Sequence, residues 1–259
     1  MTDLCGAAPA LSPRSRARRT ALWATAAALV VVGLAGVLMF RGDVWPNRLF
    51  ASGYDVRGVD VSHYQGDIDW TTLAAQDIDF AWIKATEGSS HVDPRFTTNW
   101  AAAAATDLLV GAYHFMSFES PGEEQLANLV ARVPPTPGTL PPVIDLEPYG
   151  RYVGHLPPEG EVQAILDPLV AGIEEHYGVA PIIYVTNDAY DAYVAGGYPD
   201  SPIWIRSVVT PAKLSDGRDW TIWQYSNRDR LDGYKGVESY IDMNAFTGTR
   251  GELAALTIP

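Results

Sequence analysis

The sequence predicts an α/β fold: an incomplete TIM-like (β/α) barrel with reduced final helices, preceded by one N-terminal transmembrane helix. Three observations lead to this prediction. The first 50 residues contain a long uncharged stretch and differ in composition from the remainder. Beyond them, apolar runs typical of strands covered on both faces alternate with helix-like segments. Toward the C-terminus the strand-like runs follow one another with short or irregular links, which indicates that the last helices are missing or reduced.

The N-terminal apolar stretch has the length of a membrane span. Residues Ala21–Phe40 carry no charge, and at about 1.5 Å per residue a helix of this length covers about 30 Å, the thickness of a bilayer's hydrocarbon core. The basic residues that precede it predict a cytoplasmic N-terminus by the positive-inside rule. They are Arg14, Arg16, Arg18 and Arg19.

We therefore expect a basic cytoplasmic segment over residues 1–20, a signal-anchor helix over 21–40, a linker over 41–54 and a barrel over 55–259. The barrel would lie outside the cell, attached to the membrane by a single pass. A cleaved signal peptide followed by secretion is the alternative. Its apolar core usually has about 7–15 residues and ends in an A-x-A-like site, which this sequence does not show cleanly.

Charge and cysteine content narrow the class of protein. After residue 50 the chain has 12 Lys and Arg against 29 Asp and Glu, a formal charge of −17. Nucleic acid and anionic membrane surfaces are unfavourable partners for such a domain, whereas a neutral or cationic ligand such as a sugar polymer is compatible with it. Cys5 is the single cysteine, so an exported domain must rely on its hydrophobic core instead of an internal disulfide.

The order of the elements beyond the linker carries the barrel prediction. We expect strands at Arg57–Val61, Phe80–Thr86, Leu109–Phe115, Pro142–Glu147, Pro181–Thr186, Ile203–Val208, Thr221–Tyr225 and Tyr240–Asn244. We expect helices at Trp70–Gln76, Thr97–Thr106, Glu123–Arg132 and Glu161–Tyr177.

Two carboxylates close together mark the fourth expected strand. The apolar run Pro142–Pro148 contains Asp145 and Glu147, separated by Leu146. Alternate side chains of a strand share a face, so the two acids would lie on one side with their Cα atoms about 6.6 Å apart. Acids this close seldom ionise alike, and a protonated acid beside a charged one is what cleavage of a glycosidic bond requires. Two solvated acids at a strand end are the alternative.

Other acids fall at strand ends as well. Asp60 ends the first expected strand, Glu87 follows the second, and Asp242 lies in the eighth. In barrels of this kind chemistry gathers at the carboxyl ends of the strands. Together with Asp145 and Glu147, these carboxylates would then face one mouth.

Six ordered motifs resemble those of family 25 glycoside hydrolases, the lysozyme-like muramidases. They are GVDVSHYQG (58–66), IKATEG (83–88), GAYHF (111–115), DLE (145–147), WQY (223–225) and IDMN (241–244). The resemblance runs in order from about Arg57 to Phe246 and therefore spans most of the expected barrel. Trp82 and His91 depart from the family pattern. The resemblance implies an incomplete TIM-like barrel and hydrolysis of the β-1,4 bond between N-acetylmuramic acid and N-acetylglucosamine in peptidoglycan.

Catalytic roles follow as hypotheses from position and chemistry. Glu147 is the expected general acid, with a pKa raised by the charges of Asp60 and Asp145. Asp145 would stay ionised and either activate water or hold the substrate's 2-acetamido group, so that the sugar's own carbonyl oxygen attacks. Asp60 and Asp242 would orient the pair or tune its charge. Glu87 would contact the sugar or pair with Lys84.

Aromatic side chains on or after the strand ends are candidates for lining a sugar groove, because they combine a flat ring with a polar tip. The resemblance favours the groove for Tyr113, Tyr184, Trp223 and Tyr225, and Tyr64 is a further candidate. Phe115 and Trp204 lie inside apolar runs, where core packing is the better interpretation.

No glycine-rich phosphate loop and no Cys/His metal spacing occurs, so we expect neither a cofactor nor a metal site. Two hypotheses from different classes remain. The first is a monomeric, membrane-tethered muramidase whose partner is peptidoglycan. The second is a catalytically silent barrel that binds the cell wall.

Overall fold

The computed structural model describes residues 13–259 and divides the chain into two units, Met1–Trp45 and Pro46–Pro259, which are described separately. The first unit contains helix α1 (Pro13–Phe40). Its part Ala17–Phe40 is long and apolar enough to cross a membrane, a criterion that a signal sequence also meets. Cys5 and the first 12 residues of the predicted cytoplasmic segment lie outside the described residues.

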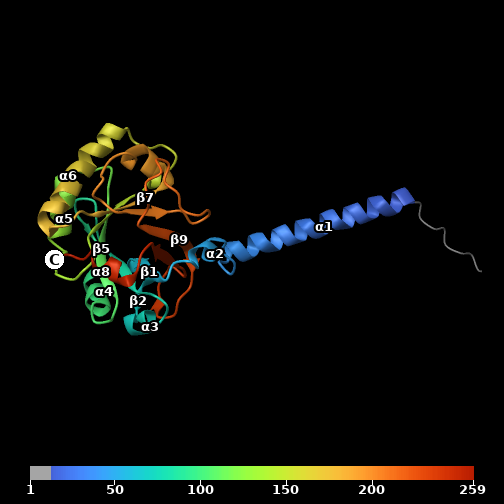
Figure 1. The fold of residues 1–259 in the computed structure, drawn as a ribbon, viewed down its shortest axis with the longest axis horizontal. Coiled ribbons are helices and arrows are strands. Elements are labelled where there is room, and N and C mark those ends of the chain that lie inside the picture. Colours follow the sequence, from blue (N-terminus) through green and yellow to red (C-terminus); the bar gives the residue numbers. More distant parts are fainter. Residues whose placement is uncertain (1–12) are drawn as a thin grey trace, which may run out of the picture. The chain divides into compact units, whose positions relative to one another are not determined.

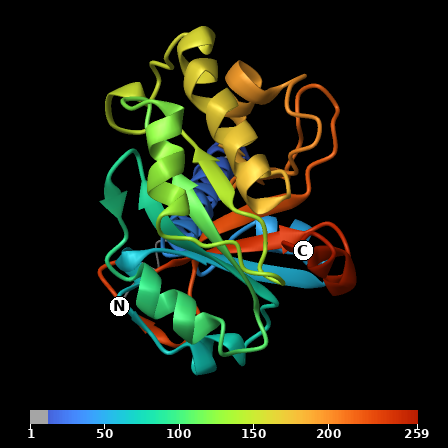
Figure 2. The same cartoon turned by 90° about the vertical axis from the view of Figure 1, so that its left-hand side faces the viewer.

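The second unit is a closed barrel (Figure 2). Its strands, in the order in which they pair around the barrel, are β1 (Val56–Val61), β11 (Ile241–Phe246), β9 (Ile222–Asp229), β8 (Ile203–Arg206), β7 (Ile182–Thr186), β6 (Val143–Leu146), β5 (Leu109–Phe115) and β3 (Phe80–Glu87). A pairing between β3 and β1 closes the ring. Each of these strands overlaps a predicted one, and the predicted fold class is confirmed.

Helices and short elements connect the strands. They are α2 (Asn47–Ala51), η1 (His63–Gln65), α3 (Trp70–Ala74), α4 (Phe96–Ala103), α5 (Gly122–Val130), η2 (Gly150–Tyr152), α6 (Glu159–Tyr177), α7 (Asn187–Ala189), η3 (Tyr190–Val194) and α8 (Arg250–Ala254), with the two-residue strands β2 (Asp67–Ile68), β4 (His91–Val92) and β10 (Tyr234–Lys235). The four predicted helices correspond to α3, α4, α5 and α6. Within the described residues, no helix separates β8 from β9 or β9 from β11, as the prediction of reduced final helices requires.

The last strand departs from an all-parallel barrel. Strand β11 runs antiparallel to both of its neighbours, β1 and β9, while the other barrel pairs are parallel. The start of β11 therefore lies at the same end of the barrel as the finish of β1. In the register, Asp242 is the direct partner of Asp60.

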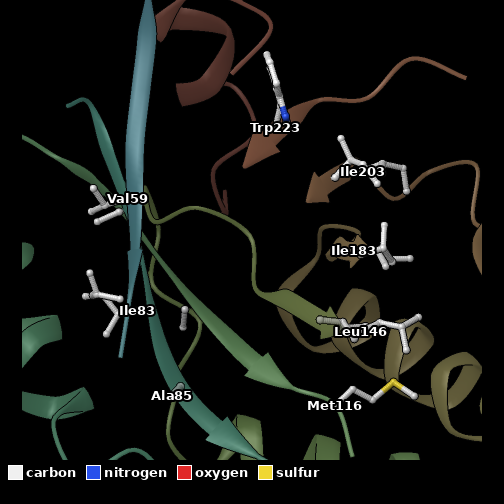
Figure 3. Packing of buried hydrophobic residues seen from close by; sticks show 14 of the residues in the cluster. Val59, Ile83, Ala85, Met116, Leu146, Ile183, Ile203 and Trp223 are labelled. Atoms are coloured by element: carbon white, nitrogen blue, oxygen red, sulfur yellow. The ribbon is translucent and has the colours of Figure 1, made fainter. Parts of the chain in front are cut away.

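Side chains of the strands alternate between two hydrophobic layers. Along β3, Phe80 and Trp82 belong to the layer inside the barrel, whereas Ala81 and Ile83 belong to the layer between the strands and the surrounding helices. Figure 3 shows members of the outer layer, including Ile83 and Leu146, on successive strands. The period of two thus decides which residues reach the barrel interior and its mouth.

The segment expected to be the end of a linker is part of the barrel. Residues from Pro46 onward belong to the barrel unit, and Asn47 is fully buried. Its Nδ2 donates hydrogen bonds to the carbonyl oxygens of Ser207 (2.7 Å), Thr210 (3.2 Å) and Tyr225 (3.3 Å). The predicted linker over 41–54 is therefore too long. The mixed composition of this short segment gave no indication that Asn47 is buried and bonds to residues far away in the sequence.

Replacing Asn47 with alanine tests this docking. Asn47→Ala removes three hydrogen bonds, although the carbonyl groups of Ser207 and Thr210 keep Nε1 of Trp223 and Oγ of Ser207 as donors. Loss of such buried hydrogen bonds typically costs about 1–3 kcal/mol in total. We expect the free energy of unfolding of the full chain, measured by denaturant titration, to fall by that order. Leu49→Ala on the same helix is the control, because Leu49 is 80% exposed and such changes usually stay within about 0.5 kcal/mol. Equal effects of both variants would contradict a docked α2.

Candidate active site

The carboxyl ends of the parallel strands surround a cavity of about 580 Å³. Four acids that the sequence assigned to catalysis line it together: Asp60, Asp145, Glu147 and Asp242. On β6, Val143 points into the barrel and Asp145 into the cavity, while Ile144 and Leu146 join the outer layer. Glu147 follows the last residue of β6 and lines the same cavity. The alternation predicted for the Asp-Leu-Glu segment is the one that the structure has.

Aromatic rings close the barrel beneath the acids. The ring of Trp204 lies 5.0 Å from those of both Trp82 and Tyr184, measured between centroids. Trp82 is fully buried, donates a hydrogen bond to the carbonyl oxygen of Pro141 (3.2 Å) and does not line the cavity. It fits because position 111 is glycine: a Cβ there would lie 2.2 Å from the indole nitrogen. The departure of Trp82 from the family pattern is thus accommodated inside the barrel.

Two amides donate hydrogen bonds to Asp60. Nδ2 of Asn244 (2.8 Å) and Nε2 of Gln224 (3.1 Å) both donate to its Oδ2. Burial raises the pKa of Asp60, and these hydrogen bonds oppose that rise. The oxygen atoms of the two amides are also engaged, because Trp204 donates to Asn244 (2.9 Å) and Tyr184 donates to Gln224 (3.1 Å). Both amides are therefore fixed with their NH₂ groups toward the carboxylate.

Asp242 lies directly opposite Asp60 in the register of β1 and β11. Burial first, and then the charge of Asp60, raise the pKa of Asp242 well above its ordinary value. The two side chains share a hydrogen bond. The pKa of Asp242 is thus raised further than that of Asp60, which accepts hydrogen bonds from two amides.

Asp145 and Glu147 form a second coupled pair. Burial raises the pKa of Glu147, the positive charge of Arg206 opposes the rise, and the charge of Asp60 adds to it. Burial and the charge of Glu147 raise the pKa of Asp145 well above its ordinary value. The sequence led us to expect that the charges of Asp60 and Asp145 raise the pKa of Glu147; burial is the largest cause, and the charge of Asp60 adds to it. Burial also disfavours the ionised Asp145 that the sequence led us to expect.

Positive side chains offset part of this buried acidity. Among the described residues that line the cavity, Lys84, Arg206 and Arg228 are cationic. The ammonium group of Lys84 lies 2.7 Å from Oε2 of Glu87 and 4.7 Å from the centre of the Phe115 ring. Arg206 ends β8 and acts electrostatically on Asp60, Glu147 and Asp242.

Comparisons with known proteins agree with this geometry. The family model "Glycosyl hydrolases family 25" matches residues 59–234. The chain belongs to this family. Lysozyme M1 of Streptomyces globisporus is 31% identical over 215 residues, which covers 78% of this chain and 71% of that protein.

Solved structures of the family have the same fold. A family 25 glycosyl hydrolase from Bacillus anthracis is 48% identical, with a TM-score of 0.75 over 79% of this chain and 94% of that chain. A bacterial lysozyme from Streptomyces coelicolor is 31% identical, with a TM-score of 0.70 over 78% and 96%. The protein is therefore a glycoside hydrolase of the lysozyme type.

Within this family 25 hydrolase, three predicted aromatic residues line the cavity and two do not. Tyr64, Tyr113 and Tyr184 line it. Trp223 and Tyr225 are buried in the outer hydrophobic layer, so their expected place in the sugar groove is wrong. Both residues follow the alternation of β9, whose inward positions are taken by residues such as Gln224. The WQY motif contributes its glutamine to the site and its aromatic rings to the core.

Other placements also differ from expectation. Phe115 and Trp204 line the cavity, although core packing was the expected role of both. Trp204 both packs in the core and lines the cavity, because it is buried and forms part of the cavity floor. Glu87 does not line the cavity and pairs with Lys84, which was one of its two expected roles.

The sequence reasoning missed Gln224, Asn244 and Arg206. The first two stood inside quoted motifs, and the period of two on their strands would have placed them on the same face as the cavity acids. Arg206 ends a strand, as the acids do, but we considered only carboxylates and aromatic rings as candidates at the strand ends.

A change of charge at Asp145 should reveal its raised pKa. A folded-state pKa above the unfolded value stabilises the protein fully at low pH, and this contribution is lost as the pH rises from the unfolded value, near 3.8, through the folded one. Asp145→Asn has no carboxyl group to ionise, so the variant does not lose this stability as the pH rises. We expect the variant to unfold at higher denaturant concentration than wild type at pH 7, with a difference that shrinks toward pH 4. Asp200→Asn, at an exposed acid, is the control. A variant that is less stable than wild type at pH 7 would contradict the burial argument.

Proposed function

We propose that this protein hydrolyses the β-1,4 bond between N-acetylmuramic acid and N-acetylglucosamine in peptidoglycan, with Glu147 as the general acid. Membership of family 25 implies peptidoglycan hydrolysis. The observation that carries the finer proposal is the pair Asp145 and Glu147, which enter one cavity from the end of β6 above a floor of aromatic rings. Tyr64, Tyr113 and Tyr184 offer rings and hydroxyl groups to a sugar in this cavity.

Glu147 suits proton donation because it lines the cavity and its pKa is raised. A general acid must hold its proton near the working pH and deliver it to the leaving glycosidic oxygen. Burial raises the pKa of Glu147 in that direction. Arg206 limits the rise, and this keeps the side chain able to ionise after it has given up its proton.

Asp145 supplies the acceptor that the reaction needs. Its Oδ1 is buried and has no hydrogen-bond partner among the described residues. A donor on the reacting molecule would satisfy this atom: either the N–H of the 2-acetamido group or the attacking water. Positive charge that develops on the sugar ring would favour the ionised form of Asp145 in the transition state, where the charge is useful. The anomer released first, followed by NMR, separates the two routes.

The location of the enzyme follows from its substrate and from α1. A cell-wall hydrolase acts outside the cytoplasmic membrane, and Ala17–Phe40 would serve either as a retained anchor or as a signal for export. We propose the retained anchor, because the apolar stretch is longer than the core of most signal peptides. Mass measurement of the protein from the membrane and from the medium distinguishes the two forms.

Glu147→Gln tests the general acid. The amide keeps the size of the side chain and cannot donate its proton to the leaving oxygen. We expect kcat for the release of reducing sugar from purified peptidoglycan to fall by about 10²–10⁴-fold, with little change in adsorption to the substrate. Glu124→Gln, an exposed exchange of the same kind on α5, should retain wild-type activity. Equal release by wild type and Glu147→Gln would refute the assignment. Adsorption without release by wild type would instead indicate a wall-binding module.

Arg206→Gln tests the electrostatic control of the acid. Arg206 lowers the pKa of Glu147, so its removal should raise that pKa further. Because Glu147 must be protonated to act, the alkaline limb of kcat/KM against pH should move to higher pH. Lys213→Gln, at an exposed lysine, should leave the limb in place. A limb that moves to lower pH would contradict the role given to Arg206.

A further inference from the structure

The cavity has a cationic side in an otherwise acidic barrel. Arg228, near the end of β9, lines the cavity. Its guanidinium lies 5.1 Å from the centre of the Tyr240 ring, and that of Arg230 lies 4.6 Å from the same ring. We name Arg228, Arg230 and Tyr240 the rim cluster. The cluster thus brings two positive charges together on one ring beside the cavity.

Several contacts hold the rim cluster in place. Arg230 Nη2 donates to the hydroxyl group of Tyr240 (3.1 Å), and the backbone N–H of Arg228 donates to Oγ of Ser226 (3.2 Å), a buried residue. The carbonyl oxygen of Tyr240 accepts from Nε2 of Gln65 (3.4 Å), and its N–H donates to Oε1 of Glu238 (3.2 Å). The cluster is thus joined both to its own loop and to the turn after β1.

The rim cluster is positively charged, whereas the domain around it is acidic. The chain after residue 50 carries a formal charge of −17, and five acids line the cavity itself: Asp60, Asp145, Glu147, Glu238 and Asp242. An anionic substituent of a substrate would be repelled by most of this surface. A planar guanidinium held over an aromatic ring offers the one arrangement suited to binding a carboxylate through two hydrogen bonds.

We propose that the rim cluster, with Arg228 as its contact residue, binds a carboxylate carried by the glycan and so selects a charged glycan over an uncharged one. This inference rests on the proposed function. In peptidoglycan such a carboxylate belongs either to the lactyl group of the muramic acid or to the attached peptide. Both sources share the chemistry that Arg228 recognises. The cluster is a specificity determinant, separate from the acids that carry out hydrolysis.

The experiment compares Arg228→Gln with wild type on four substrates. They are intact peptidoglycan, peptidoglycan freed of its peptides by an amidase, and each of these after its carboxylates have been converted to neutral methylamides. We expect Arg228→Gln to raise KM on intact peptidoglycan by about tenfold with kcat nearly unchanged, as loss of a charge-assisted hydrogen bond would do. On the neutralised substrates, wild type should have the raised KM of the variant, and the variant should change no further.

The remaining comparisons identify the source and exclude a structural effect. A rise in KM that is lost on the amidase-treated glycan shows that Arg228 binds only the peptide carboxylate, and one that persists shows that it also accepts the lactyl carboxylate that the amidase sets free from its amide bond. Arg132→Gln, the same change at an exposed residue just after α5, should leave KM unchanged. Arg228→Gln should keep the unfolding midpoint of wild type.

Two outcomes would overturn the inference. One is an unchanged KM in Arg228→Gln, and the other is a KM raised equally on charged and neutralised substrates. Adsorption to insoluble peptidoglycan, measured in the Glu147→Gln background, provides the same comparison without turnover. If wild type releases no reducing sugar from any substrate, the proposed function fails, while the adsorption measurement still decides whether Arg228 binds the carboxylates.

Discussion

The site depends on the cost of burying several carboxylates in one barrel mouth. Closure of the barrel brings the strand ends into a ring, and strand alternation turns Asp60, Asp145 and Asp242 toward its centre. Buried ionised acids are unfavourable unless hydrogen bonds or opposite charges compensate them. The molecule reduces this cost by protonation and by a small number of fixed donors. The pKa of each of these acids is raised, with burial as the largest cause.

Hydrogen bonds compensate the acids unequally, and this gives Asp60 and Asp145 different roles. Asp60 receives two amide donors whose own oxygens are engaged by Trp204 and Tyr184, so its charge is supported from below the cavity. Asp145 has a buried oxygen without a partner among the described residues. One acid is therefore satisfied within the fold, whereas the other requires a donor from the reacting molecule. The aromatic floor contributes to catalysis through this hydrogen-bond relay as well as through packing.

The antiparallel direction of β11 completes the acid group. Had β11 run parallel to its neighbours, its first residues would lie at the opposite end of the barrel, and Asp242 would be far from Asp60. The direct pairing of the two residues depends on the reversal. The reversal also explains why no helix lies between β9 and β11 within the described residues, because an antiparallel neighbour needs no crossover connection.

The sequence predicted the barrel, its strands and the four acids because their signals are local. Apolar runs mark strands, and acids at strand ends can be found by position alone. The directions of individual side chains and the causes of the pKa shifts do not depend on local sequence. The inward direction of Gln224 and the outward direction of Trp223 depend on the register of β9 within the ring, and motif resemblance treated the three residues as one group. The pKa causes depend on the depth of the cavity, which a strand pattern does not contain.

The outer face of β9 explains why the barrel begins earlier than predicted. With no helix between β9 and β11 in the described chain, Trp223 and Tyr225 need another cover. The N-terminal segment provides it: Tyr54 packs against the ring of Trp223, with centroids 6.4 Å apart, and Asn47 caps the carbonyl oxygen of Tyr225. Whether α1 is retained as an anchor or removed as a signal, removal of residues 46–54 would expose this face. Processing that leaves a stable enzyme must therefore cut before Pro46.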